Sequence, residues 1–218
     1  MKIKELIVYT QNLKSQIDFY SKVLEFEILH QNDISCRFKL GDSILSFIYQ
    51  KNATPYHFAF NIPSNKADEA LIWLKQRINI LPFNGKEMVD FKSWNAKALY
   101  FYDYDKNIVE FISRKNINMH SYVPFSSKDI LNISEIGVSS TDMEKTFKTI
   151  NVFKLIDVYS GNFERFCALG NDEGMFIIAN PTVKKWFPND DVIEQSDFIL
   201  KGDYNFEFKN GEFMPFNS

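Results

Sequence analysis

Short runs of apolar residues, each followed by a helix-like pattern, recur along this chain. The run over 3–9 predicts a strand, and the apolar spacing over 13–24 predicts a helix that begins after Asn12. Three further strands are predicted at 26–29, 34–40 and 43–49, with Gly41-Asp42 as the turn between the last two. The first 50 residues therefore read as one strand, one helix and three strands, a βαβββ unit.

The same order of elements returns twice. The second unit has predicted strands over 56–62, 80–83, 99–103 and 108–113. After the first of them we expect a helix that is capped by Ser64 or Asn65 and carries Ala67, Leu71, Trp73 and Leu74. A third unit begins near Ile133, with a helix over 142–150 and strands over 163–169 and 175–179. Repeats at a period of about 50 residues indicate that the architecture is built from copies of this unit.

The chain is too short for a fourth unit. After Asn180 the sequence contains a hairpin signal, Asn210-Gly211, between aromatic strands. We therefore expect an α+β fold from paired βαβββ units that form a curved mixed sheet with a cleft, plus a partial second module. The expected domains are a complete module over 1–114 with the site, a linker over 115–130, and a degenerate module with a C-terminal hairpin over 131–218.

Ligand-type side chains occupy related places in these repeats. Glu5 and His57 stand near or at the start of a strand and are 52 residues apart, and Glu110 follows His57 by 53 residues on another strand. Strand alternation places the three on one face and a set of apolar residues on the other, namely Leu6, Val8, Phe58, Phe60, Val109 and Phe111. A lone His or Glu on a strand is more often exposed or hydrogen-bonded, but three at matched positions favour a metal site.

Composition excludes several classes of function. The net charge of −3 gives no broad basic surface for nucleic acid, and no apolar run reaches the length needed to span a bilayer. The two cysteines, Cys36 and Cys167, have no metal-type spacing, which suits a reducing compartment. The N-terminus lacks the apolar core of a signal peptide, so we expect a cytoplasmic protein.

Three segments resemble the vicinal oxygen chelate superfamily, which includes glyoxalase I, extradiol dioxygenases and bleomycin-binding proteins. The first segment is 5–26, in which Glu25 stands where the family usually has Gly. The second is 56–62. The third is the hairpin over 100–111, in which Tyr104 and Lys106 replace the usual Pro and Gly.

The resemblance implies that Glu5, His57 and Glu110 are the metal ligands. Glu5 departs from the His or Gln that the family commonly has there, and this favours lyase or isomerase chemistry over ring-cleaving dioxygenase chemistry. One His with two carboxylates suits Mn²⁺, Fe²⁺, Zn²⁺ or Mg²⁺. A substrate with two adjacent oxygens would chelate the metal, which would stabilise an enolate or a related oxyanion. Glu5 and Glu110 are then the candidate catalytic carboxylates, and Glu5 is alternatively a general base beside a metal with fewer protein ligands.

Other residues are weighed against ordinary structural roles. Arg37 and Tyr100 are candidates for substrate binding, although a surface salt bridge is the commoner role for Arg and packing the commoner role for Tyr. Glu135 repeats the Glu5 position, but no counterpart of His57 or Glu110 follows it, which suggests a unit without its own site. Trp186 begins a segment, Trp-Phe-Pro, that reads as a hydrophobic anchor for the tail.

Three functions stay open from the sequence. The first is a metal-dependent enzyme acting on a small oxygenated substrate. The second is a bleomycin-resistance-like protein that sequesters an aromatic molecule without catalysis. The third is a relic with neither metal nor ligand. The resemblance also implies a homodimer as an expectation, because family members often complete their sheets across subunits.

Overall fold

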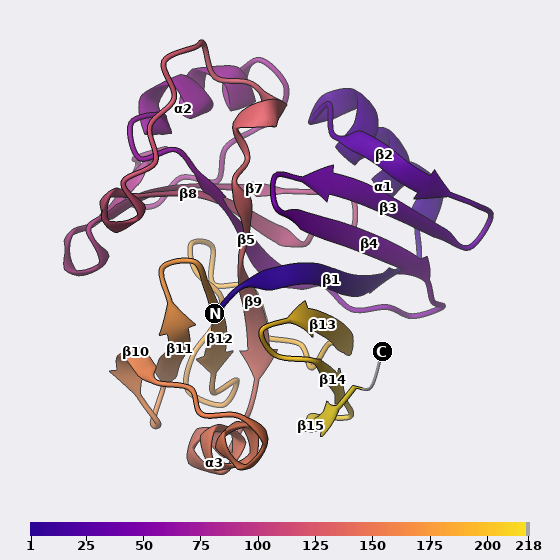
Figure 1. Ribbon diagram of the computed structural model, residues 1–218, viewed down its shortest axis with the longest axis vertical. Coiled ribbons are helices and arrows are strands. Elements are labelled where there is room, and N and C mark those ends of the chain that lie inside the picture. Colours follow the sequence, from indigo (N-terminus) through magenta and orange to yellow (C-terminus); the bar gives the residue numbers. More distant parts are fainter. Residues whose placement is uncertain (217–218) are drawn as a thin grey trace.

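The computed structural model describes residues 1–216; the last two residues of the expected range 131–218 lie outside the described residues. Figure 1 shows four groups of elements around a central pair of strands. The first group is β1 (Ile3–Thr10), α1 (Leu13–Asp18), a π-helical turn (Phe19–Val23), β2 (Glu27–Gln31), β3 (Ser35–Leu40) and β4 (Ser43–Tyr49). The second is β5 (His57–Ile62), α2 (Ala67–Lys75), β6 (Val89–Phe91), β7 (Ala96–Tyr102) and β8 (Ile108–Arg114).

The third and fourth groups come from the second half of the chain. The third is β9 (Asn132–Ser139), α3 (Met143–Phe153), β10 (Val158–Asn162), β11 (Phe166–Asn171) and β12 (Gly174–Ala179). The fourth is β13 (Phe198–Gly202), β14 (Phe206–Lys209) and β15 (Glu212–Pro215), the last two joined by a turn at Asn210-Gly211. The α+β class and the repeated βαβββ unit are confirmed. The expected strand over 80–83 is reduced to two isolated bridges, Ile80 with Phe101 and Phe83 with Lys86.

The units pair in an order that the sequence did not indicate. The central path of the sheet runs β15-β14-β13-β1-β9-β5-β8-β7-β6, so β9 lies between β1 and β5. The second unit therefore pairs with the third through β5 and β9, and the first unit pairs with the C-terminal hairpin through β1 and β13. Among residues 1–216, no strand of the first unit pairs with a strand of the second. The expected pairing within 1–114 is thus not found, and the domain boundaries at 114 and 130 stay a prediction.

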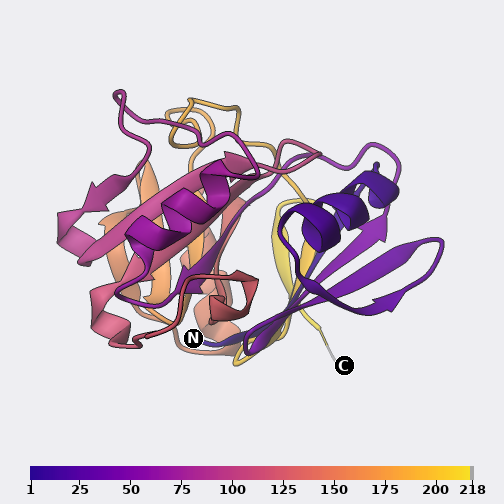
Figure 2. The same ribbon diagram turned by 90° about the horizontal axis from the view of Figure 1, so that it is seen from above.

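The two sides of the sheet differ in character. The apolar face predicted from alternation is buried throughout, including Leu6, Phe58 and Val109. In Figure 2, α1 and α2 are seen over the strands of their own units. The other face of β5, β8 and β9 lines a second, smaller apolar cluster that includes Ala59, Tyr100 and Trp186. This second face holds the candidate site.

A hydrogen-bonded clamp joins the first unit to the β7–β8 turn. The Asp103 carboxylate accepts hydrogen bonds from Gln16 at 2.9 Å and from Tyr20 at 2.9 Å, and all three side chains are buried. In the same turn, Asp105 accepts hydrogen bonds from Thr10 and Asn12. These contacts hold the two units together although their strands do not pair.

Two departures from the family pattern coincide with unusual backbone geometry. Glu25 has a φ of 57° and Lys106 a φ of 63°, both in the left-handed region that favours glycine. The usual Gly at these places therefore has a conformational reason, and this chain retains the turns with larger residues. Among residues 1–216, none of the helices has the length and apolar content needed to cross a membrane.

Candidate metal centre

Three strands bring a histidine and two glutamates together. β5 pairs in parallel with β8, which sets Ala59 opposite Glu110, and antiparallel with β9, which sets Ala59 opposite Glu135. The two carboxylates therefore flank Ala59 from either side, and His57 precedes Ala59 by two residues on the same face. Because the alanine side chain is short, the space above it is left to the three larger side chains.

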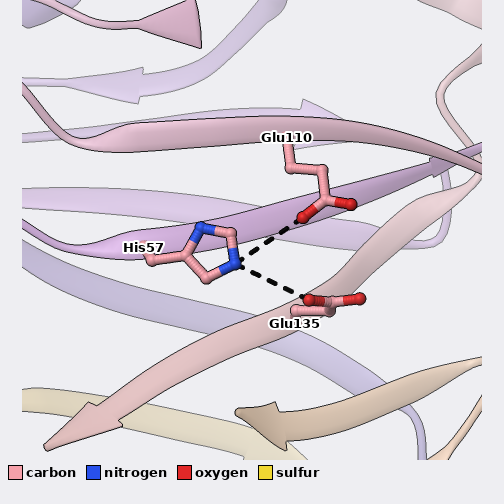
Figure 3. A group of neighbouring side chains, drawn as sticks. All are labelled: His57, Glu110 and Glu135. Atoms are coloured by element: carbon pink, nitrogen blue, oxygen red, sulfur yellow. Dashed lines mark ion pairs between the residues drawn. The ribbon is translucent and has the colours of Figure 1, made fainter. Parts of the chain in front are cut away.

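The three side chains converge on one point (Figure 3). The His57 Nε2 atom lies 3.6 Å from a Glu110 oxygen and 3.7 Å from a Glu135 oxygen. Each of the three residues offers one nitrogen or oxygen atom as a ligand, and these three atoms all lie within 4.8 Å of one another. All three residues are buried. In the part of the chain that the structure describes, this is the only such group of three or more His, Cys, Asp or Glu residues.

The hydrogen bond on the far side of the imidazole fixes its orientation. His57 Nδ1 lies 3.1 Å from the carbonyl oxygen of Ile108, which can only accept, so Nδ1 carries the proton. Nε2 is then the ring nitrogen left to bind a cation or a second proton, and it faces the two carboxylates. Three electron-rich atoms that face one another in a buried site are unfavourable unless a cation or a proton lies among them. The donor set of one imidazole and two carboxylates therefore fits a divalent metal.

Each carboxylate has its own supporting side chain. The Tyr100 hydroxyl acts on Glu110 and favours its ionised form, and Glu135 accepts a hydrogen bond from the guanidinium of Arg114, which is fully buried. Burial raises the pKa of Glu110 well above its ordinary value, and the negative charge of Glu135 raises this pKa further. Burial likewise raises the pKa of Tyr100, which keeps its hydroxyl protonated as a donor. The positions of both carboxylates are thus held from behind, as metal ligands usually are.

Glu5 lies elsewhere. Its carboxylate accepts a hydrogen bond from Ser46 at 2.8 Å and forms ion pairs of 3.2 Å with Arg37 and Lys201. Burial alone would raise the pKa of Glu5, but these hydrogen bonds and charges outweigh it and lower the pKa. A carboxylate between two cations does not need a metal.

The expected ligand set therefore needs a correction. The structure brings His57 and Glu110 together, and Glu135 rather than Glu5 completes the group. The physical reason is strand order, because β9 and not β1 is the antiparallel neighbour of β5. Of the two residues expected to bind substrate, Tyr100 lines the site, whereas Arg37 pairs with Glu5 away from it. The catalytic and binding roles of all these residues stay predictions.

A cavity of about 260 Å³ opens above the three side chains. Its walls are mostly aromatic and include Phe91, Trp94, Phe166, Trp186 and Phe187. Trp186 belongs to the connection between β12 and β13, and its ring centroid lies 5.3 Å from that of His57. The sequence analysis assigned this segment to anchoring the tail and missed its place at the site.

Gly137 explains how Trp186 reaches the site. A Cβ atom at Gly137 would lie 2.8 Å from the indole ring and 3.2 Å from the Cβ atom of His57. The absence of a side chain on this residue of β9 therefore makes room for the indole. A glycine two residues after Glu135, on the same face of the strand, was the one available signal in the sequence.

Comparisons with known proteins agree with this architecture. A 116-residue stretch, 50% of the chain, is 29% identical to metallothiol transferase FosB from Staphylococcus epidermidis and covers 80% of that protein. No protein-family model matches the chain.

Two solved structures share the fold over most of the chain. A proposed dioxygenase from Bacillus subtilis aligns with a TM-score of 0.61 at 14% identity, covering 82% of this chain and 63% of that one. A mutant of glyoxalase I from Zea mays aligns with a TM-score of 0.57 at 14% identity, covering 88% and 72%. The chain thus spans less than two thirds of the Bacillus subtilis protein. The FosB relative and the shared fold confirm the resemblance to the vicinal oxygen chelate superfamily that the three sequence segments indicated.

Proposed function

We propose that this protein is a metal-dependent enzyme that acts on a small oxygenated substrate. His57, Glu110 and Glu135 would hold one divalent cation and leave further positions on it for substrate. The observation that carries the proposal is the position of the His57 Nε2 atom, 3.6 and 3.7 Å from oxygens of two buried carboxylates. The FosB relative, named as a metallothiol transferase, supports metal-dependent chemistry on this fold.

The protein's own residues would prepare the site for reaction. Each of the three side chains has a supporting partner: His57 has the Ile108 carbonyl, Glu110 has Tyr100 and Glu135 has Arg114. The ligand atoms would therefore need little rearrangement to bind a metal. The aromatic walls surround the site with mostly apolar surface, which would strengthen electrostatic interactions inside the cavity. When bound, a divalent cation would supply Lewis-acid stabilisation to an oxyanion of the substrate. Lyase, isomerase and transferase reactions all use this chemistry.

Metal content tests the proposal. We expect the purified protein, incubated with Mn²⁺, Fe²⁺ or Zn²⁺ and desalted, to retain about one divalent ion per chain by elemental analysis, in keeping with a single three-ligand site. His57→Ala and Glu110→Gln should each lose it while keeping the circular dichroism spectrum of the parent protein. No retained metal in the parent protein would contradict the proposal. It would instead favour the other prediction from the sequence, a protein that sequesters an aromatic molecule in the same cavity.

A further inference from the structure

The cavity above the metal centre has three chemically different parts. The candidate metal ligands form its floor and aromatic rings form its walls. Lys184 is also a lining residue, and its Nζ atom lies near the ring of Phe166, another lining residue. The first two parts were used in the proposal above. Lys184 has no part in holding the metal-binding side chains, so its presence in this lining needs a separate reason.

Lys184 is a cation without a carboxylate partner. Within residues 1–216 it forms no salt bridge, and its Nζ atom lies 5.6 Å from the centre of the Phe166 ring. The side chain is half-buried, and both burial and the nearby positive charge of Arg165 lower the pKa of its amino group. The negative charge of Asp190 acts in the opposite direction, but no described residue forms a salt bridge with Lys184. A partly desolvated cation beside a second cation is stabilised by an anion in direct contact with it.

The aromatic walls of the cavity indicate the shape of a ligand that would bind there. Trp186 and Phe187 come from the same connection as Lys184, and Trp94 and Phe166 lie 6.1 Å apart, centroid to centroid, on other elements. Flat aromatic side chains on several sides of a cavity favour a flat, conjugated ligand, because ring contacts prefer offset-stacked or edge-to-face arrangements. A volume of about 260 Å³ limits the ligand to a small molecule.

We propose that the substrate is a small planar aromatic or conjugated acid, bound with its ring between the aromatic walls and its carboxylate at Lys184. This inference rests on the proposed function, because it names the substrate class of the same site. It assigns to Lys184 a role in specificity. The oxygens that meet the metal would then lie at the opposite end of the molecule from the carboxylate.

A pair of probes that differ only in charge tests the inference. trans-Cinnamate carries a carboxylate, and trans-cinnamamide has nearly the same shape without the charge. Their binding would be measured by calorimetry to the full-length protein, with metal and after EDTA treatment. Because the carboxylate of cinnamate can itself bind a divalent metal, the effect of charge at Lys184 is read from the EDTA-treated protein. This comparison does not depend on the proposed metal function.

The expected result is a charge preference that depends on one lysine. The parent protein should bind cinnamate about tenfold more tightly than cinnamamide, a ratio in keeping with a hydrogen bond to a charged group. Lys184→Met should abolish this preference by weakening cinnamate alone. The matched control, Lys185→Met, changes the exposed neighbour and should leave the preference intact. Unchanged melting temperatures would show that both variants fold.

Three outcomes would overturn the inference. One is equal affinity of the parent protein for the two probes. A second is a charge preference that persists in Lys184→Met. The third is no binding of cinnamate up to millimolar concentration in either the metal-loaded or the EDTA-treated protein.

Discussion

Arg114 is the residue on which the charge balance of the candidate site depends. It is fully buried, and its guanidinium contacts Glu135 and lies 3.7 Å from Asp172. Its Nε and Nη1 atoms have no hydrogen-bond partner, so the pairing with carboxylates is its main compensation for burial. Removing one member of a buried ion pair leaves the other charge uncompensated.

Arg114→Met should therefore lower the free energy of unfolding by about 3–5 kcal/mol. Adding Glu135→Gln to this variant should restore part of the loss, because the orphaned charge is then removed as well. Urea unfolding would measure both effects. As a control, Lys75→Met breaks an exposed pair with Glu87 and should change stability by at most about 1 kcal/mol. A loss below 1 kcal/mol in Arg114→Met would contradict this view of the pair.

At the scale of single elements, the sequence predicted the strands and helices well. Alternation gave β1, β4 and β5 to within one residue at either end. The second helix was predicted with a cap at Ser64 or Asn65, whereas α2 is capped by Lys66. The first helix was less well predicted, because it changes from α to π geometry at Phe19. The same alternation placed His57 and Glu110 correctly on one face of the sheet. The alternation of side chains along single strands was therefore enough to predict which face of the sheet carries the site.

The β7–β8 hairpin carries Tyr100 and Glu110 and turns at Lys106, whose φ of 63° is strained for a residue with a side chain. Lys106→Gly should relieve this strain and raise the free energy of unfolding by about 0.5–1 kcal/mol. Lys39→Gly, at the last residue but one of β3, should instead lower it. Thermal or urea unfolding of the two variants would test the expected opposite signs, and a loss of stability in both would contradict the argument.

At the scale of the whole molecule, local pattern could not specify which units pair. Glu5 and Glu135 hold equivalent positions in repeated units, and nothing near either residue shows which of β1 and β9 lies beside β5. That choice depends on contacts between segments that are far apart in the sequence. The cytoplasmic location and the homodimer also stay predictions, because they depend on the surroundings of the protein rather than on its fold.

The buried clamp at Asp103 couples the first unit to the second and should give stability a pH dependence. Burial raises the pKa of Asp103 to about 6, although Asn107, Tyr20 and Gln16 donate hydrogen bonds that favour its ionised form. In the unfolded chain an Asp has a pKa of about 3.9. Since the folded-state pKa is the higher one, this group contributes stability at low pH that is lost as the pH rises towards 6.

Tyr20→Phe removes one donor to the ionised carboxylate. The variant should lose about 1–3 kcal/mol of stability at pH 8, where Asp103 is ionised, and less at pH 5, where it is mostly protonated. Urea unfolding at the two pH values would measure the difference. Tyr122→Phe, at a side chain that is 91% exposed, should have no effect at either pH. A Tyr20→Phe loss that is larger at pH 5 would contradict the assignment.

The central claim is that Glu135, brought to His57 by the order of the strands, completes a metal site that Glu5 does not enter. The most direct test compares the Mn²⁺ or Zn²⁺ affinity of Glu135→Gln and Glu5→Gln by calorimetry. We expect Glu135→Gln to weaken binding by about 100-fold or more, since even changes behind a ligand cost 10–100-fold. Glu5→Gln should bind like the parent protein. Loss of affinity in Glu5→Gln, with parental affinity in Glu135→Gln, would contradict the account.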